Sequence, residues 1–311
     1  MMDVLYWAFI FAVSLAILIK SSEYFTLSAE EIGIYFGIPS FVVGVTIVSL
    51  GTSLPELVSS VIAVLSDSTE IVTGNVVGSN IANIFLILGI AAIIGKNMKI
   101  SYELIHVDLP MLFGSAILLT LTLWDGVFTS TEAILAILGA VIYIAYTASS
   151  VKERGGKSKQ KGKMSAATVG TLIVSGAFIY LGASYTIESV IRLSELLNVG
   201  KEIIAITAIS IGTSLPELMV SASAARFGRA EIAVGNVLGS NIFNSYLVIG
   251  VPALIGPLKV TETIIDLGLP MMVVATFLYF FMTQDREITG WEGMVLILFY
   301  VLFLGKLFAF I

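Results

Sequence analysis

Seven residues, Gly-Thr-Ser-Leu-Pro-Glu-Leu, occur twice in the chain, at positions 51–57 and 212–218, and each copy lies inside a long apolar segment. Each copy therefore places a carboxylate, Glu56 or Glu217, and a helix-disrupting proline where hydrocarbon would surround the chain. A charged group in that setting is costly and marks a functional site by default. The duplication indicates two similar halves that bring these carboxylates into a protected place.

The composition is that of an integral membrane protein. Hydrophobic residues make up 57% of the chain and charged residues 12%, against about 25% charged residues in a soluble domain. A membrane-spanning helix needs about 20 largely apolar residues. We predict an all-α membrane protein with ten transmembrane helices, near residues 3–20, 38–65, 70–95, 105–124, 130–151, 165–188, 202–225, 230–256, 263–283 and 290–310.

The two halves align over most of their length. A shift of 161 residues maps Asn75 onto Asn236, and a shift of 160 maps Glu132 onto Glu292. Each half holds five predicted helices, an odd number, so the second half enters the membrane from the opposite side. Two five-helix inverted-topology repeats are typical of secondary transporters, whose sites lie at the midplane between the repeats. We expect repeats at 1–151 and 165–311, joined by a linker at 152–164.

The linker predicts the orientation of the chain. It carries six Lys or Arg residues between Lys152 and Lys163, together with glycines, and is the most polar stretch of the sequence. Positive charge favours the cytoplasmic side. With the linker there, 12 of the 16 Lys and Arg residues are cytoplasmic. We therefore predict a multi-pass protein of the cell membrane with both termini extracytoplasmic.

Polar side chains form stripes on the helices that carry the two carboxylates and on the helices that follow. Positions i, i+3, i+4 and i+7 share one face of a helix. The first pair of stripes is Ser49, Thr52, Ser53 and Glu56 with Ser210, Thr213, Ser214 and Glu217. The next helices carry Asn75, Ser79 and Asn83 with Asn236, Ser240 and Asn244. We expect these four polar segments to cross at the protein centre, with Pro55 and Pro216 breaking their helices and freeing carbonyl oxygens.

The chemistry of these stripes indicates a site for cations. No Lys or Arg lies on the polar segments to balance the two carboxylates. Calcium prefers about 6–8 oxygen ligands from carboxylates, carbonyls and amides, whereas magnesium retains waters in an octahedron. Because the chain has no Cys and a single His, His106, soft metals are disfavoured. We expect transported ions rather than a resident cofactor, and no nucleic-acid partner.

On these motifs the chain resembles the cation/calcium antiporter superfamily, in particular prokaryotic sodium/calcium exchangers, over essentially its whole length. The resemblance implies exchange of Ca²⁺ for monovalent cations by alternating access, with long tilted first and sixth helices that gate the core. It implies that Glu56 and Glu217 are shared Ca²⁺ ligands. It also implies backbone carbonyl ligands to Ca²⁺ at Thr52 and Thr213, and monovalent-ion sites formed by Ser49, Ser53, Ser79, Ser210, Ser214 and Ser240.

The chain departs from the resemblance at one pair of positions. Sodium-driven relatives commonly carry an aspartate at one of the positions held here by Asn83 and Asn244. Two carboxylates balance one Ca²⁺ or two protons, whereas three Na⁺ would leave a net charge. The hydroxyls suited to Na⁺ are all present, so the sequence leaves Na⁺ and H⁺ open as the counter-ion.

Two other classes of protein remain as alternatives. A cation channel would also use carboxylates, but conduction needs a continuous pore and normally several subunits, whereas we expect one chain to function as a monomer. An intramembrane enzyme would use paired glutamates as acid and base, but no nucleophile or metal-binding motif accompanies them, so we predict a non-enzyme. We assign Asp108 and Asp266 to surface positions at helix ends.

Overall fold

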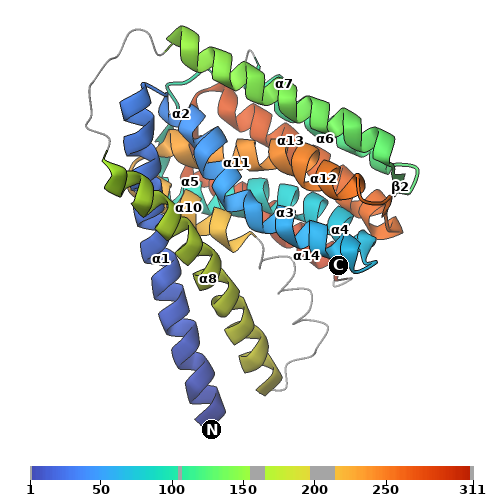
Figure 1. The fold of residues 1–311 in the computed structure, drawn as a ribbon, viewed down its shortest axis with the longest axis horizontal. Helices are drawn as coiled ribbons and strands as arrows, with labels where there is room; N and C mark the ends of the chain where they lie inside the picture. Colours follow the sequence, from blue (N-terminus) through green and yellow to red (C-terminus); the bar gives the residue numbers. More distant parts are fainter. Residues whose placement is uncertain (1, 104–106, 155–164, 197–213, 309–311) are drawn as a thin grey trace.

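The computed structural model describes residues 2–103, 107–154, 165–196 and 214–308 (Figure 1). The first half contains α1 (Met2–Phe36), α2 (Ser40–Val43), η1 (Gly44–Val48), α3 (Ser49–Leu65), α4 (Thr69–Ala82), η2 (Asn83–Leu88), α5 (Gly89–Gly95), β1 (Asn97–Lys99), α6 (Asp108–Leu123), β2 (Val127–Phe128) and α7 (Ser130–Arg154). The second half contains α8 (Ala166–Leu196), α10 (Leu215–Arg226), α11 (Ala230–Phe243), η4 (Asn244–Val248), α12 (Ile249–Ala253), β3 (Leu258–Lys259), η5 (Ile264–Gly268), α13 (Leu269–Gln284), β4 (Glu287–Thr289) and α14 (Gly290–Leu307). Labels with η are π-helical segments.

These elements confirm the predicted spans. In the described part of the chain, eight helices are long and apolar enough to cross a membrane, and Asp108–Leu123 is a shorter apolar helix. The remaining predicted span, 202–225, is described from Ser214 onward. Several sequence predictions fall outside the described residues, namely most of the linker (155–164), His106, Ser210 and Thr213.

Burial places two of the spans at the centre of the bundle. In an apolar stretch of 18 residues, 94% of the residues are buried in the span formed by α11, η4 and α12, and 72% in the span formed by α4, η2 and α5. In contrast, only 17% of the residues are buried in such a stretch of α1. The two stripes of asparagine and serine predicted to reach the protein centre therefore lie on the two most enclosed of the eight spans in the described part of the chain, as a site shielded from lipid requires.

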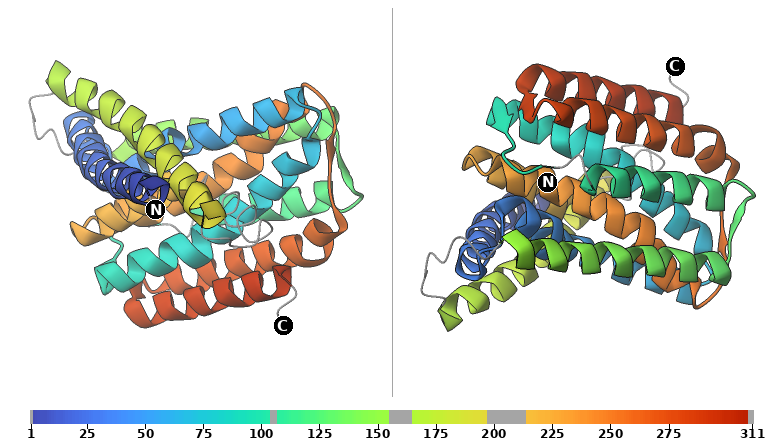
Figure 2. Two further views of the ribbon diagram at one scale, coloured as in Figure 1. Left: turned by 90° about the horizontal axis from the view of Figure 1, so that it is seen from below. Right: turned by 90° about the horizontal axis from the view of Figure 1, so that it is seen from above.

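The first and sixth spans are longer than predicted and lie apart from the rest. α1 has 35 residues and α8 has 31, so α1 is about 52 Å long at 1.5 Å per residue, more than a hydrocarbon core of about 30 Å. Both helices project from the bundle in Figure 1, and in both views of Figure 2 they lie at one side of it. α1 continues beyond the predicted end because its later residues, including Ser22, Phe25 and Ala29, are buried.

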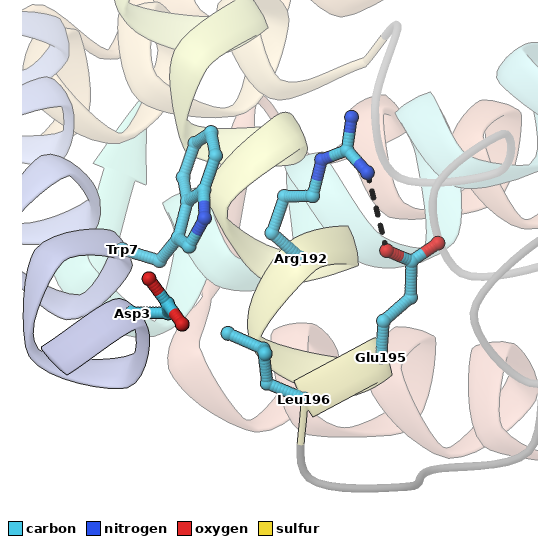
Figure 3. Close-up of a pocket in the computed structure, with 5 residues that line it drawn as sticks. All are labelled: Asp3, Trp7, Arg192, Glu195 and Leu196. Atoms are coloured by element: carbon cyan, nitrogen blue, oxygen red, sulfur yellow. Dashed lines mark hydrogen bonds and ion pairs between the residues drawn. The ribbon is translucent and has the colours of Figure 1, made fainter. Parts of the chain in front are cut away.

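α1 and α8 pack against each other along their length. Near the middle, the Thr186 hydroxyl donates to the Ser14 hydroxyl at 3.0 Å, and a Cβ on Gly182 would approach the Leu18 backbone to 3.0 Å. At the far end, the Arg192 guanidinium lies 6.0 Å from the ring centre of Trp7 (Figure 3). These contacts make the two helices one packed unit.

This helix pair touches the core mainly near the end of α1. Glu30 of α1 forms a partly buried ion pair with Arg229, which precedes α11. The ring of Phe25 fills the space beside Gly51, where a Cβ would lie 2.7 Å from it. α1 therefore contacts α3, the helix that carries Glu56.

Two short strand pairs join the halves at opposite ends of the bundle. β1 pairs with β4, with Met98 opposite Ile288, and β2 pairs with β3, with Phe128 opposite Leu258. The shift of 160 residues maps one pair onto the other in the same register. The helices that follow β2 and β4 begin in the same way. In each, a threonine hydroxyl, of Thr129 or Thr289, donates a hydrogen bond to the carboxylate of the glutamate three residues later. The structure therefore has the inverted symmetry expected from the sequence.

The prediction for Asp108 is wrong, whereas the prediction for Asp266 is confirmed. Asp266 is exposed, but Asp108 is only 2% exposed and accepts a hydrogen bond from the Tyr143 hydroxyl at 3.2 Å. The physical reason is packing, because α7 brings a buried tyrosine to the first turn of α6. In the repeat alignment Gly268 corresponds to Asp108, so this carboxylate belongs to one half only.

Replacing Tyr143 by Phe tests this buried contact. Loss of a donor to a buried carboxylate is expected to lower the free energy of unfolding by about 1–3 kcal/mol. Thermal unfolding in detergent measures the change, and Tyr180→Phe, at a tyrosine that is 52% exposed on α8, is the control. Equal melting temperatures for both variants and the wild type would show that the contact contributes nothing.

Candidate ion-binding site

The helices of the site contain π-helical segments at the polar stripes. η1 ends immediately before Ser49, η2 begins at Asn83, and η4 begins at Asn244. π-helical turns are rare and frequently lie at functional sites. Here the change in helical pitch falls at three residues predicted to bind ions, in both halves of the chain.

The predicted helix break at Pro55 is wrong. α3 runs from Ser49 to Leu65 with Pro55 inside it, which membrane helices tolerate when neighbouring groups compensate for the lost backbone bond. Pro216 instead lies in the first turn of the described part of its helix, α10, where a missing N–H is not needed.

Small residues allow α11 to lie directly against the segment that leads into α3. A Cβ on Gly235 would lie 2.5 Å from the backbone oxygen of Phe41. On Gly239 it would lie 2.5 Å from both the Ser49 hydroxyl and the Val45 backbone oxygen. Gly235 and Gly239 form a Gly-x-x-x-Gly pair, and they therefore allow α11 to approach this segment closely.

The two repeated glutamates meet at this crossing. Glu56 is 1% exposed and Glu217 is 2% exposed, and they lie near enough to interact through their charges. The Ser53 hydroxyl, one turn before Glu56, donates to Glu217 Oε1 at 3.3 Å. The Oε2 atom of each glutamate is buried and receives no hydrogen bond from the described residues.

Hydroxyl and amide groups surround these carboxylates. The hydroxyls of Ser53 and Ser240 lie 3.2 Å apart, and those of Ser214 and Ser79 lie 3.5 Å apart. The Thr52 hydroxyl lies 3.3 Å from both the Ser49 carbonyl oxygen and Asn236 Oδ1. Except for the contact between Thr52 and Ser49 within α3, these contacts join helices of opposite halves, so residues far apart in the sequence form one polar centre.

The amides predicted to bind ions fall into two groups. Asn83 and Asn244 are buried, and the Oδ1 atom of each receives no hydrogen bond from the described residues. Asn75 and Asn236 lie about two turns earlier. There Asn75 Oδ1 accepts from the Ser79 hydroxyl at 3.4 Å, and Asn236 donates to the Ser221 hydroxyl at 2.8 Å. Asn83 and Asn244 therefore present amide oxygens that accept no hydrogen bond from the described residues, whereas Asn75 and Asn236 orient nearby hydroxyls.

No basic side chain balances the charge of the two glutamates in the described part of the chain. The ion pairs found there join other acidic residues, such as Glu23, Glu30 and Glu103, to Lys or Arg. Among the described residues, no three or more His, Cys, Asp or Glu side chains lie close enough together to hold a metal ion. The centre thus offers two carboxylates with neutral oxygen donors, a set suited to a hard cation.

The structure brings twelve of the fourteen predicted residues into these four crossing segments, and the other two, Ser210 and Thr213, lie outside the described residues. Sequence reasoning missed Asn80 and Asn241, which are 2% exposed and bond across the halves. Each follows a stripe serine by one residue, and therefore points about 100° away from the stripe. Their duplication and the cost of a buried amide were the available signals.

A family model described as sodium/calcium exchanger protein matches residues 6–152 and 167–309. The chain belongs to the sodium/calcium exchanger family. Within this family it is similar to the sodium/calcium exchanger MaX1 of Methanosarcina acetivorans, at 35% identity over 96% of this chain and 97% of that protein. It is also similar to the inner membrane protein YrbG of Escherichia coli, at 30% identity over 88% of each chain.

Solved structures of another sodium–calcium exchanger, NCX_Mj, have the same fold. The structure soaked with zero Na⁺ and Ca²⁺ matches with a TM-score of 0.86 and 27% identity, over 98% of this chain and 99% of that chain. The structure soaked with 2.5 mM Na⁺ and 0.1 mM Ca²⁺ matches equally well, with a TM-score of 0.86. This member of the sodium/calcium exchanger family is therefore a multi-pass membrane transporter with the ten-helix, two-repeat fold.

Proposed function

We propose that the protein exchanges Ca²⁺ for Na⁺ across the cell membrane by alternating access, with Glu56 and Glu217 as shared central ligands. The observation that carries the proposal is the meeting of two buried carboxylates from oppositely oriented halves, each with an oxygen that lacks a donor among the described residues. Two such charges are stable together in a low-dielectric site only when a cation balances them. One Ca²⁺ balances them fully.

The ligand shell follows from the neighbouring oxygens. Asn83 and Asn244 would offer Oδ1 atoms that accept no hydrogen bond from the described residues, and Thr52 would offer its carbonyl. The close hydroxyls of Ser53, Ser79, Ser214 and Ser240 would form the flanking Na⁺ sites. Ser49, Asn75 and Asn236 complete the proposed set, as do Ser210 and Thr213 by the repeat. These oxygens match the preference of both ions for hard ligands.

Alternating access would use the α1–α8 unit and the inverted halves. The repeats at 1–151 and 165–311 would exchange their conformations to open the site to either side. The α1–α8 unit contacts α3 through Phe25, so its movement would reach the helix of Glu56. We place the linker in the cytoplasm and both termini outside. One chain supplies both carboxylates, so a monomer would suffice.

The names of similar proteins support Na⁺ as the counter-ion, because MaX1 and NCX_Mj are sodium/calcium exchangers. A specific observation favours H⁺ as the second candidate. Both Asn83 and Asn244 are amides, so two protons would neutralise the two glutamates fully, as Ca²⁺ does. Three Na⁺ ions would leave one net positive charge in the site.

Flux measurements in proteoliposomes separate these candidates. We expect vesicles loaded with Na⁺ and diluted into Na⁺-free buffer to take up ⁴⁵Ca²⁺, and vesicles with equal Na⁺ on both sides not to do so. A pH gradient alone should drive no uptake. Uptake driven only by the pH gradient would assign H⁺ as the counter-ion, and uptake that ignores both gradients would rule out antiport.

A further inference from the structure

A chain of hydrogen bonds fixes the orientation of Asn83. The backbone carbonyl of Asn80 accepts from Asn241 Nδ2 at 3.2 Å, and Asn241 Oδ1 accepts from Asn83 Nδ2 at 2.9 Å. A backbone carbonyl only accepts hydrogen bonds, so Asn241 must turn its NH₂ group toward Asn80. Its oxygen is then left to face Asn83, which must donate. The backbone carbonyl of Asn80 therefore determines which end of each amide, Asn241 and Asn83, donates and which accepts.

The remaining end of Asn83 is an acceptor. Its Oδ1 atom is buried and receives no hydrogen bond from the described residues. A cation requires the oxygen of an amide, because the NH₂ end carries partial positive charge. Asn83 can thus present its ligating oxygen permanently, without the cost of turning the side chain when an ion arrives.

Among the described residues, the symmetry-related amide, Asn244, lacks this restraint. By the repeat, Asn80 corresponds to Asn241 and Asn83 corresponds to Asn244. Asn80 instead donates to the Ser245 hydroxyl at 2.8 Å, and its Oδ1 atom receives no hydrogen bond from the described residues. No bond equivalent to that between Asn83 and Asn241 therefore holds Asn244. Asn80 and Asn241, the matching amides of the two halves, therefore have different hydrogen-bond partners.

We propose that Asn241 is a positioning residue for ion binding, which locks Asn83 with its amide oxygen available to the cation and leaves Asn244 without the equivalent lock. This inference rests on the proposed transport of Ca²⁺ through the site. Partners that orient metal ligands typically contribute 10- to 100-fold to metal affinity. Asn241→Ala should therefore raise the KM for Ca²⁺ by about tenfold with little change in kcat.

Asn80→Ala is the matched control. Asn80 is equally buried at the same helix crossing, and its replacement removes the bond to Ser245 while the backbone carbonyl stays. If Asn241 merely joined α4 to α11, both variants would lose thermal stability and neither would change the KM for Ca²⁺ selectively. We expect Asn80→Ala to keep the wild-type KM within about twofold, as expected for a group outside the ligand shell.

A double mutant tests whether Asn241 acts through Asn83. Asn83→Ala removes the ligand itself, so adding Asn241→Ala should then leave the KM for Ca²⁺ unchanged. Asn241→Ser, whose side chain is too short to reach Asn83 but keeps a polar group at this buried position, provides the same comparison if the alanine variant does not fold. Further weakening in the double mutant, or a wild-type KM in the single variants, would overturn the proposal. Absence of Ca²⁺ uptake by the wild type would instead overturn the proposed function.

Discussion

Glu56→Gln and Glu217→Gln are each expected to abolish Ca²⁺ transport while leaving the protein folded. Either change leaves one carboxylate to balance a doubly charged ion in a buried site. Removing one partner of a buried charge interaction costs about 3–5 kcal/mol, so Ca²⁺ should bind at least about 100-fold more weakly. Proteoliposome uptake measures transport, and the Ca²⁺-dependent rise in melting temperature measures binding.

The glutamine variants should be as stable as the wild type without Ca²⁺, or more so, since the two buried charges no longer repel each other. Glu70→Gln is the control, because Glu70 is an exposed acidic residue in the first turn of α4. It removes the same charge from the molecule and should transport normally. Wild-type uptake by either core variant would contradict the assignment of that glutamate.

Gly239→Val is expected to prevent correct packing of the core. Its Cβ alone would lie 2.5 Å from the Ser49 hydroxyl and from the Val45 backbone oxygen. α11 would have to move away from α3, separating the two halves of the site. Overpacking of this kind typically costs about 1–3 kcal/mol, occasionally more, and valine adds two further methyl groups. Size-exclusion chromatography and thermal unfolding in detergent should show aggregation or a large loss of stability.

Gly114→Val provides the matched control. Gly114 is also a helical glycine, in α6, and a Cβ there meets no atom within 4 Å among the described residues. The variant should elute and unfold like the wild type. A similar loss of stability in both variants would mean that valine destabilises these helices in general and that the crossing at Gly239 is not special.

The spans were predictable because lipid restricts the available structures. Without water to satisfy the backbone, each long apolar segment must form a helix. The prediction failed at the end of the first span. α1 extends to Phe36 because residues such as Thr26 and Ala29 are buried, and such packing has no hydropathy signal.

The meeting of most residues at the candidate site was predictable because the polar stripes occur twice. A single buried glutamate need not have a function, but the duplication of Glu56 as Glu217 with the same flanking hydroxyls indicates that both belong to one functional site. Helical spacing then placed the stripe residues on common faces. The contacts of Asn241 were not predictable, because they depend on how α4 and α11 cross and not on periodicity within either helix.

The strand pairs have a consequence for how such a chain originates. Met98 with Ile288 and Leu258 with Phe128 form a single contact used twice, which is the property of an isologous interface. Two identical half-length polypeptides, inserted in opposite orientations in one bilayer, would satisfy both pairings without any covalent connection. Fusion of such a dimer would then allow each copy to diverge, and Asp108 opposite Gly268 is one position where the copies have done so.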